Sequence, residues 1–120
     1  MKIALTASSN SSTGSMESRF GRAQGFIIYD SESRKSEFLD NTVNMNSAQG
    51  AGIQSAMNLI KAGVQTVITG HCGPKAFNLL KNAGIAVYLT EAHSVSEAIQ
   101  LFESNSLKIL EAPDVNGHWN

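Results

Sequence analysis

Hydrophobic residues in the first forty positions follow patterns that are typical of β-strands. Residues 2–7, 25–30 and 35–41 form short apolar or alternating runs of strand length. The second and third runs are separated only by the polar stretch 31–34, which predicts a β-hairpin. A serine-rich loop lies between the first two runs. We therefore expect three consecutive strands before any helix.

The pattern changes after residue 50, where helix and strand signals alternate. Ile53, Met57 and Ile60 stand at i, i+4 and i+7 of a helix that begins at Gly50-Ala51-Gly52. Gly63 occupies the position that commonly ends a helix. The β-branched run 64–69 follows and is typical of a buried parallel strand.

Two more helices are predicted by their starting signals. Gly73-Pro74 places proline in the first turn of a helix that ends at Gly84. Residues 85–90 form a fifth strand. The capping box Ser94-Val95-Ser96-Glu97 begins a third helix, which extends through Phe102.

This order of elements predicts an α/β fold. Helical connections make strands three, four and five parallel through right-handed crossovers, whereas the hairpins make strand two antiparallel. We expect one domain over residues 1–120, with a mixed five-stranded sheet in the order 3-2-1-4-5, three helices and a ribonuclease-H-like arrangement. The tail from about residue 107 is expected to fray, adding at most a short extended piece.

Composition excludes several classes of protein. The 120 residues are 42% hydrophobic and 16% charged, and the apolar runs are too short to cross a membrane. A net charge of −1 gives no reason to expect a nucleic-acid partner. The single cysteine excludes an internal disulfide framework, and Met1-Lys2 leads directly into a strand without a signal sequence. We expect a cytoplasmic protein.

The predicted topology brings the unusual residues to one edge of the sheet. Loops that follow strands one, three, four and five leave from the same edge, because these strands run in the same direction. Residues 19–22 enter the antiparallel second strand and so lie at that edge too. Open α/β sheets bind ligands there.

Two groups of residues at this edge are candidates for binding an anion. Gly50 and Gly52 bring backbone N–H groups to a helix N-terminus, although a tight turn would also explain them. Arg19 and Arg22 offer guanidinium groups, which stay charged and donate in a fork. The alternative for the arginines is an ordinary surface position, with one of them paired to Glu17 or Asp30.

The dipeptide His71-Cys72 lies between two glycines at the end of the fourth predicted strand. An imidazole and a thiol suit a soft metal or an iron–sulfur fragment. Both can reach one ligand only if the loop turns between them, because adjacent side chains on an extended backbone point in opposite directions. A buried cysteine beside a hydrogen-bonded histidine is the alternative.

Sequence features argue against an enzyme. A ribonuclease-H-type nuclease needs several carboxylates around two metal ions, one of them on the first strand, and residues 2–7 contain no acid. The chain also lacks the Walker, GxGxxG, GxSxG and CxxC motifs. We therefore expect no catalytic residues.

The chain resembles the dinitrogenase iron–molybdenum cofactor biosynthesis family in the order and spacing of several segments through about Phe102. The matching segments are Met1–Ala4, Ser18–Ala23 with Phe26 and Asp30, Gly50–Ile53, Gly63-Val64 with Val67, Gly70–Phe77, and Ala83–Ile85 with Val87-Tyr88. The resemblance implies a ribonuclease-H-like fold, an association with iron–sulfur or molybdenum-containing clusters, and binding roles for Arg19, Arg22, Gly50, Gly52, His71 and Cys72. The chain departs from the family pattern at residues 44–49, where some relatives have histidines and this chain has Met45 and Gln49.

The expected function is that of a non-enzymatic carrier for an iron–sulfur or molybdenum-containing cluster, or for its precursor. Cys72 and His71 are the predicted metal ligands, and cluster-assembly proteins are expected partners. One alternative is a regulatory module that binds a small anion or nucleotide. Another is a protein-interaction module without a metal.

Overall fold

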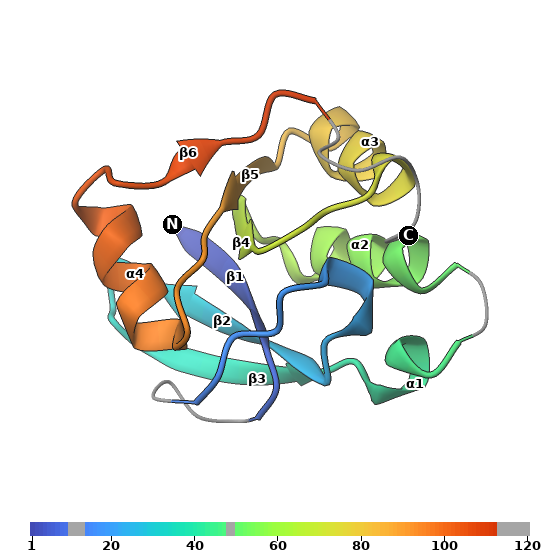
Figure 1. Cartoon of the computed structure of the whole chain (residues 1–120), viewed down its shortest axis with the longest axis horizontal. Helices are drawn as coiled ribbons and strands as arrows, with labels where there is room; N and C mark the ends of the chain where they lie inside the picture. Colours follow the sequence, from blue (N-terminus) through green and yellow to red (C-terminus); the bar gives the residue numbers. More distant parts are fainter. Residues whose placement is uncertain (10–13, 48–49, 113–120) are drawn as a thin grey trace.

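A mixed β-sheet forms the centre of the computed structural model, which describes residues 1–9, 14–47 and 50–112 (Figure 1). Its strands are β1 (Lys2–Ala7), β2 (Gly25–Asp30), β3 (Ser36–Asp40), β4 (Thr66–Thr69), β5 (Ala86–Leu89) and β6 (Lys108–Ile109). The described strands lie in the order β3-β2-β1-β4-β5-β6. β2 is antiparallel to both neighbours, and β1, β4 and β5 are parallel. The predicted order of the first five strands is confirmed.

The prediction of a five-stranded sheet was wrong, because β6 adds a sixth strand at the edge. It pairs antiparallel with β5, with Ile109 opposite Tyr88 and Lys108 opposite Leu89. The backbone N–H of Leu110 then donates to the carbonyl of Val87 at 2.7 Å. Residues just after 107 are therefore held by the sheet, whereas residues 113–120 lie outside the described part of the chain. The ribonuclease-H-like classification stays a prediction.

Three long helices form where the sequence predicts them. They are α2 (Ala51–Ala62), α3 (Pro74–Asn82) and α4 (Val95–Glu103). The predicted capping box of α4 is present: Ser94 Oγ accepts from the Glu97 N–H at 3.2 Å, and the Glu97 carboxylate accepts from the His93 N–H at 3.0 Å. The sequence did not predict the one-turn helix α1 (Thr42–Met45) or the 3-10 turn η1 (Phe20–Arg22).

The helices cover both faces of the sheet. α2 and α3 pack on one face, where Leu59, Phe77 and Leu80 are buried against β1, β2, β4 and β5. α4 packs on the other face through Val95 and Ala98. Figure 1 shows α4 on the side of the sheet opposite to α2 and α3. Consecutive right-handed crossovers place α2 and α3 on the same face of the sheet. Both helices follow strands that run in the same direction, so both begin at the carboxyl edge of the parallel strands.

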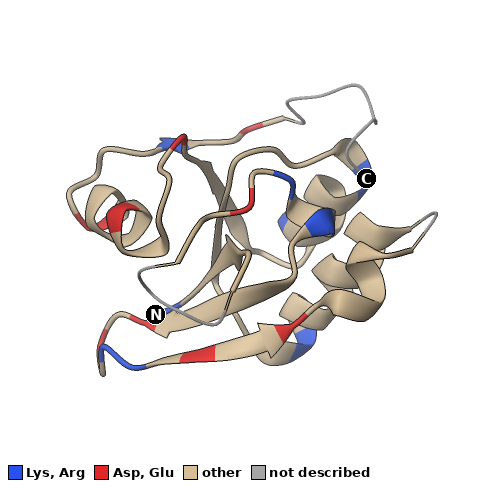
Figure 2. Cartoon of the chain, turned by 60° about the horizontal axis from the view of Figure 1, so that its bottom comes forward, with Lys and Arg blue, Asp and Glu red and all other residues tan. Residues whose placement is uncertain are grey.

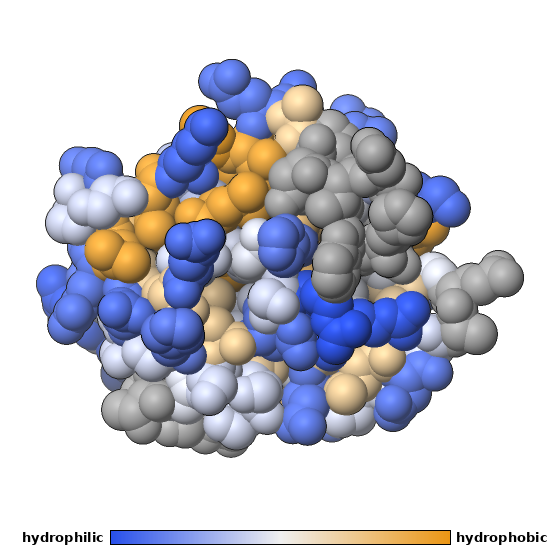
Figure 3. Space-filling view, in the orientation of Figure 1, coloured by the Kyte–Doolittle hydropathy of each residue, from blue (hydrophilic) through white to orange (hydrophobic). Residues whose placement is uncertain are grey.

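Part of the surface over β5 and β6 is apolar. Figure 3 shows hydrophobic side chains gathered there, where Tyr88, Phe102, Leu107 and Ile109, together with Glu103 and Asn105, line a hollow of 420 Å³. None of the helices in the described part of the chain has the length and apolar composition needed to cross a membrane.

Candidate site at the carboxyl edge of the sheet

The segment before η1 runs alongside the end of β4. Arg19 and His71 form a parallel β-bridge. The His71 N–H donates to the Ser18 carbonyl at 2.6 Å, and the Phe20 N–H donates to the His71 carbonyl at 3.1 Å. This pairing places Arg19 beside His71, although they are 52 positions apart in the sequence. The predicted convergence of these two segments on one edge is confirmed.

Glycine at position 70 makes this close pairing possible. A Cβ atom on Gly70 would lie 2.7 Å from the carbonyl oxygen of Ser18 and 2.9 Å from its Cα. Both atoms belong to the backbone, so a larger residue would push the two segments apart. The glycine that precedes His71 is thus explained by backbone packing.

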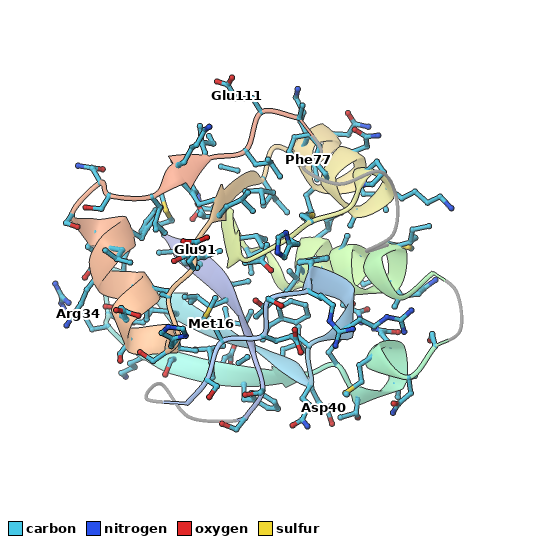
Figure 4. The ribbon with its side chains drawn as sticks, in the orientation of Figure 1. Met16, Arg34, Asp40, Phe77, Glu91 and Glu111 are labelled. Carbon is cyan, nitrogen blue, oxygen red and sulfur yellow. The ribbon has the colours of Figure 1, made fainter. Side chains whose placement is uncertain are left out.

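A groove lies between this segment and the loop that follows β5. Two adjoining hollows of 450 and 340 Å³ share Ser18, Gly70, Thr90 and Glu91. Their other lining residues are Ser15, Met16, Glu17, His71, Leu89, Ala92 and His93. Met16 and Glu91 line the first hollow, and Figure 4 shows their side chains near one another, from segments far apart in the sequence. We call this set of residues the edge groove.

Charge divides the carboxyl edge into two parts. The lining of the edge groove includes the carboxylates of Glu17 and Glu91 and neither lysine nor arginine. Arg19 lies beside His71 at the rim, and Lys75 lies in the first turn of α3. Figure 2 shows the acidic and basic positions following each other along the segment that leads into η1. An anion is therefore favoured at the rim of the groove over its acidic interior.

Arg19 already interacts with a carboxylate. Its Nε lies 3.6 Å from Oε2 of Glu17, and its backbone N–H donates to the same oxygen at 2.9 Å. The Arg19 side chain is 45% exposed. Pairing with Glu17 was one of the two partners expected if the arginines were surface residues. The exposed guanidinium can still face a ligand in solution.

Arg22 contacts the loop that follows β3. Its Nη1 donates to the carbonyls of Met45 and Ser47 at 3.0 and 2.6 Å. These bonds fasten the connection between β3 and α2 to η1. The structure therefore gives Arg22 a role in fixing a loop, and anion binding by Arg22 stays a prediction.

The same connection is held from below by a buried asparagine. Asn41 is 2% exposed, and its Nδ2 donates to the carbonyl of Ala23 at 2.9 Å. Its Oδ1 accepts from Asn44 Nδ2 and Ser55 Oγ, both at 3.0 Å. The sequence carries no distinctive signal for this network, because an asparagine after a strand is also common in ordinary turns.

The start of α2 is partly covered. Gly50 is its N-cap, with φ of 77°, a left-handed conformation that favours glycine. Gly52 is buried, and a Cβ atom on Gly21 would lie 2.7 Å from the Gly52 nitrogen. The first turn of α2 therefore lies against η1, at the same edge as His71. Turn geometry at Gly50 and close packing at Gly52 are the alternative that the sequence left open.

His71 and Cys72 point in opposite directions. His71 is half-buried and lines the edge groove, whereas Cys72 is fully buried in the core with Phe20 and Ala76. Among the described residues, no group of three or more His, Cys, Asp or Glu side chains could hold a metal ion. Ligation by His71 stays a prediction, and ligation by Cys72 would require the loop between β4 and α3 to open.

Comparison with known proteins places these features in a family. The model of the dinitrogenase iron-molybdenum cofactor family matches residues 1–105. An uncharacterized protein of Methanocaldococcus jannaschii is 34% identical over 114 residues, which cover 92% of each chain.

Two solved structures have the same fold and more than 30% identity. The apo form of the orange protein from Desulfovibrio gigas aligns with a TM-score of 0.91 and 36% identity, covering 95% of this chain and 96% of the other. A NifB-like protein from Thermotoga aligns with a TM-score of 0.85 and 34% identity, covering 97% and 98%. The match of the family model over most of the chain, together with these relatives, shows that the chain belongs to the dinitrogenase iron-molybdenum cofactor family.

Proposed function

We propose that this protein binds and carries an anionic metal–sulfur cluster, containing iron or molybdenum, or a precursor of one, and that it catalyses no reaction. Membership of the dinitrogenase iron-molybdenum cofactor family supports a cluster-related role. Likeness to a NifB-like protein supports a place among cluster-assembly proteins, which would be its partners in the cytoplasm.

The observation that carries this proposal is the bridge between Arg19 and His71 at the carboxyl edge. It brings a permanently charged donor next to a half-buried imidazole, directly before the N-terminus of α3. The N-terminus of α3, with its partial positive charge and with Lys75 in its first turn, follows His71 closely in the chain. Anionic sulfur or oxygen atoms would meet hydrogen-bond donors there, and the half-buried imidazole of His71 offers a nitrogen ligand that suits iron.

The residues present fit a cargo that is held mainly by charge. Because the described residues include no cluster of three metal-ligating side chains, a bare metal ion would have few ligands. A preformed cluster brings its own sulfur ligands and needs only contacts with its surface. The buried position of Cys72, the chain's strongest nucleophile, is consistent with a carrier that performs no covalent chemistry.

The test is anaerobic reconstitution with iron and sulfide, or with molybdate and sulfide, followed by desalting, metal analysis and an absorption spectrum. We expect the wild type to retain metal and sulfide, and His71→Ala to retain much less. His93→Ala is the matched control, because His93 lines the same groove, whereas the β-bridge with Arg19 is formed by His71. Equal retention by both variants would remove His71 from the site.

A regulatory module that binds a plain anion is the alternative outcome. Phosphate or a nucleotide would then bind at the same rim through Arg19 and the α3 N-terminus, and no metal would survive desalting. Binding of neither cluster nor anion by the wild type would overturn the proposed function.

A further inference from the structure

Glu17 holds its carboxylate where a bound anion would meet Arg19. Oε2 of Glu17 accepts from the backbone N–H of Arg19 at 2.9 Å and from Ser18 Oγ at 3.4 Å, and lies 3.6 Å from Arg19 Nε. The same residue lines the edge groove. One carboxylate oxygen thus meets both the main chain and the side chain of the arginine at the rim.

The backbone of Glu17 is fixed from beneath. Its N–H donates to the Thr6 carbonyl at 3.1 Å, and its own carbonyl accepts from Thr6 Oγ1 at 2.6 Å. Thr6 is fully buried, and its hydroxyl also contacts that of Thr69 at 3.2 Å. These bonds hold the backbone of Glu17 at the rim, so its carboxylate leaves Arg19 most readily by rotation of the side chain.

We infer that Glu17 is an internal anion that competes with the cargo for Arg19 and thereby sets the affinity of the site; this inference rests on the proposed function. An incoming anion competes with the carboxylate for the guanidinium, and the Glu17 side chain turns away as the anion takes its place. A carrier gains from such a competitor, because the returning carboxylate assists release of the cargo to the next protein.

The ion pair between Glu17 and Arg19 is weak enough for an anion to compete with Glu17, and it does not close the site to anions. The Arg19 side chain is 45% exposed and that of Glu17 is 22% exposed, so water and salt weaken their attraction. Exposed ion pairs change an equilibrium by about two- to fivefold. Removal of the Glu17 charge should therefore tighten anion binding by roughly that factor, and this gain should shrink at high salt.

The decisive variant is Glu17→Gln, because glutamine keeps the oxygen that accepts from the Arg19 N–H and removes only the charge. Glu91→Gln is the matched control, since Glu91 lines the same groove and belongs to the loop after β5. The probes are molybdate, titrated at low and high salt, and iron with sulfide, measured as metal retained after reconstitution.

We expect Glu17→Gln to bind more tightly than the wild type, Glu91→Gln to gain clearly less, and Glu17→Gln combined with Arg19→Gln to lose the gain. A simple loss of structure would lower affinity, so a gain cannot arise from misfolding. Equal gains in both glutamate variants, or no gain in Glu17→Gln, would overturn the inference while the proposed function stands. If the wild type and all variants bind neither probe, both the proposed function and the inference fail.

Discussion

Gly21 packs directly against Gly52, so that a Cβ atom on Gly21 would lie 2.7 Å from the Gly52 nitrogen and 2.8 Å from its Cα. Both are backbone atoms and cannot rotate away. The contact joins η1 to the start of α2, and the bond from the Phe20 N–H to the His71 carbonyl joins η1 to the end of β4. The position of Arg19 at the rim therefore depends on the packing of two glycines.

Gly21→Ala should disturb the site as well as the fold. Forcing a methyl group into a closely packed contact costs about 1–3 kcal/mol, and here the shift falls on η1. We expect a lower free energy of unfolding in chemical denaturation and weaker binding of molybdate. The variant tests whether η1 holds the anion-binding residues in place.

Gly63→Ala is the control for this change. Gly63 ends the same helix with φ of 77°, and nothing lies within 4 Å of a Cβ atom placed there. The left-handed conformation costs a non-glycine residue about 1–2 kcal/mol, so the loss of stability should be similar. Molybdate binding should persist, because Gly63 lies at the end of α2 away from η1. A comparable loss of binding in Gly63→Ala would show that the effect of Gly21→Ala is global.

Cys72 should react slowly with thiol reagents in the native protein. Its side chain is fully buried in the core that α2 and α3 share with the sheet, so labelling requires an opening of the structure. Cys72→Ala should lower the free energy of unfolding by about 0.5–1.5 kcal/mol, as for deletion of one methyl-sized group, and leave metal retention unchanged. The measurement is the rate of labelling by a disulfide reagent with and without denaturant. Labelling of the native protein as fast as the unfolded one would place the thiol at the surface.

The period of the hydrophobic pattern was sufficient to predict most of the sheet. The apolar character of β1, β2 and β4 reflects burial on both faces of the sheet, which the sequence records directly. β6 has only two residues, both exposed, and is too short to show a pattern of hydrophobic and polar positions. It exists because Tyr88 and Leu89 offer an unpaired edge, which is a tertiary relationship that no local pattern reveals.

The candidate site was predictable only as far as topology determines it. The directions of β2 and β4 bring the segment with Arg19 and the loop with His71 to one edge, as the sequence predicts. The contacts of Arg22 with loop carbonyls depend on the path of the loop after β3. No repeating pattern of hydrophobic residues in the sequence predicts that path. Adjacent residues at a strand end point in opposite directions, but sequence alone could not tell whether His71 or Cys72 faces the core.

Asp40 should make the protein more sensitive to acid. The pKa of Asp40 lies below its ordinary value of 3.8, chiefly because the backbone N–H of Thr42 donates to its carboxylate, with the Thr42 hydroxyl contributing as well. A lowered native pKa means that the charged form stabilises the fold above pH 3.8, and that this contribution disappears as the pH falls through the native pKa. NMR titration of Asp40 should show the lowered midpoint.

Two variants separate the causes of this pKa shift. Thr42→Val removes the hydroxyl but keeps the N–H, so the midpoint should rise only part of the way toward 3.8. Asp40→Asn should flatten the dependence of unfolding on pH between about 5 and 2. An unchanged acid dependence in Asp40→Asn would show that other carboxylates dominate it.

Asn41→Ala should be among the most damaging single changes to the loop after β3. It removes three side-chain hydrogen bonds and leaves the Ala23 carbonyl, Asn44 and Ser55 with unmet polar groups in the interior. Each unmet buried group costs about 1–3 kcal/mol, and we expect a net loss of roughly 3 kcal/mol in chemical denaturation. Asn46→Ala is the control, since the exposed side chain of Asn46 donates to the nearby Thr42 carbonyl within the same short helical turn. A loss below 1 kcal/mol for Asn41→Ala would contradict the network.

Arg19→Gln and Arg22→Gln should have opposite signatures, although the two arginines are three positions apart. Arg22 is half-buried, and loss of its bonds to the carbonyls of Met45 and Ser47 should lower the free energy of unfolding by about 1.5–3 kcal/mol. Hydrogen exchange should rise at the described residues 42–47. Arg19→Gln should leave stability within about 0.5 kcal/mol, because nearly half of its side chain is exposed and its ion pair with Glu17 is weak.

Molybdate binding should be impaired more by Arg19→Gln than by Arg22→Gln, which is the reverse of their expected order in loss of stability. Arg19→Gln removes the charge at the rim, so molybdate affinity should fall about two- to fivefold or more and depend less on salt. Arg22→Gln should retain the salt dependence of the wild type, because the guanidinium it loses is engaged with loop carbonyls. The measurement is a titration of each variant at low and high salt, beside a denaturation curve. If Arg22→Gln abolishes the salt dependence while Arg19→Gln preserves it, the anion lies over η1 and the start of α2, and the assignment of the two arginines must be exchanged.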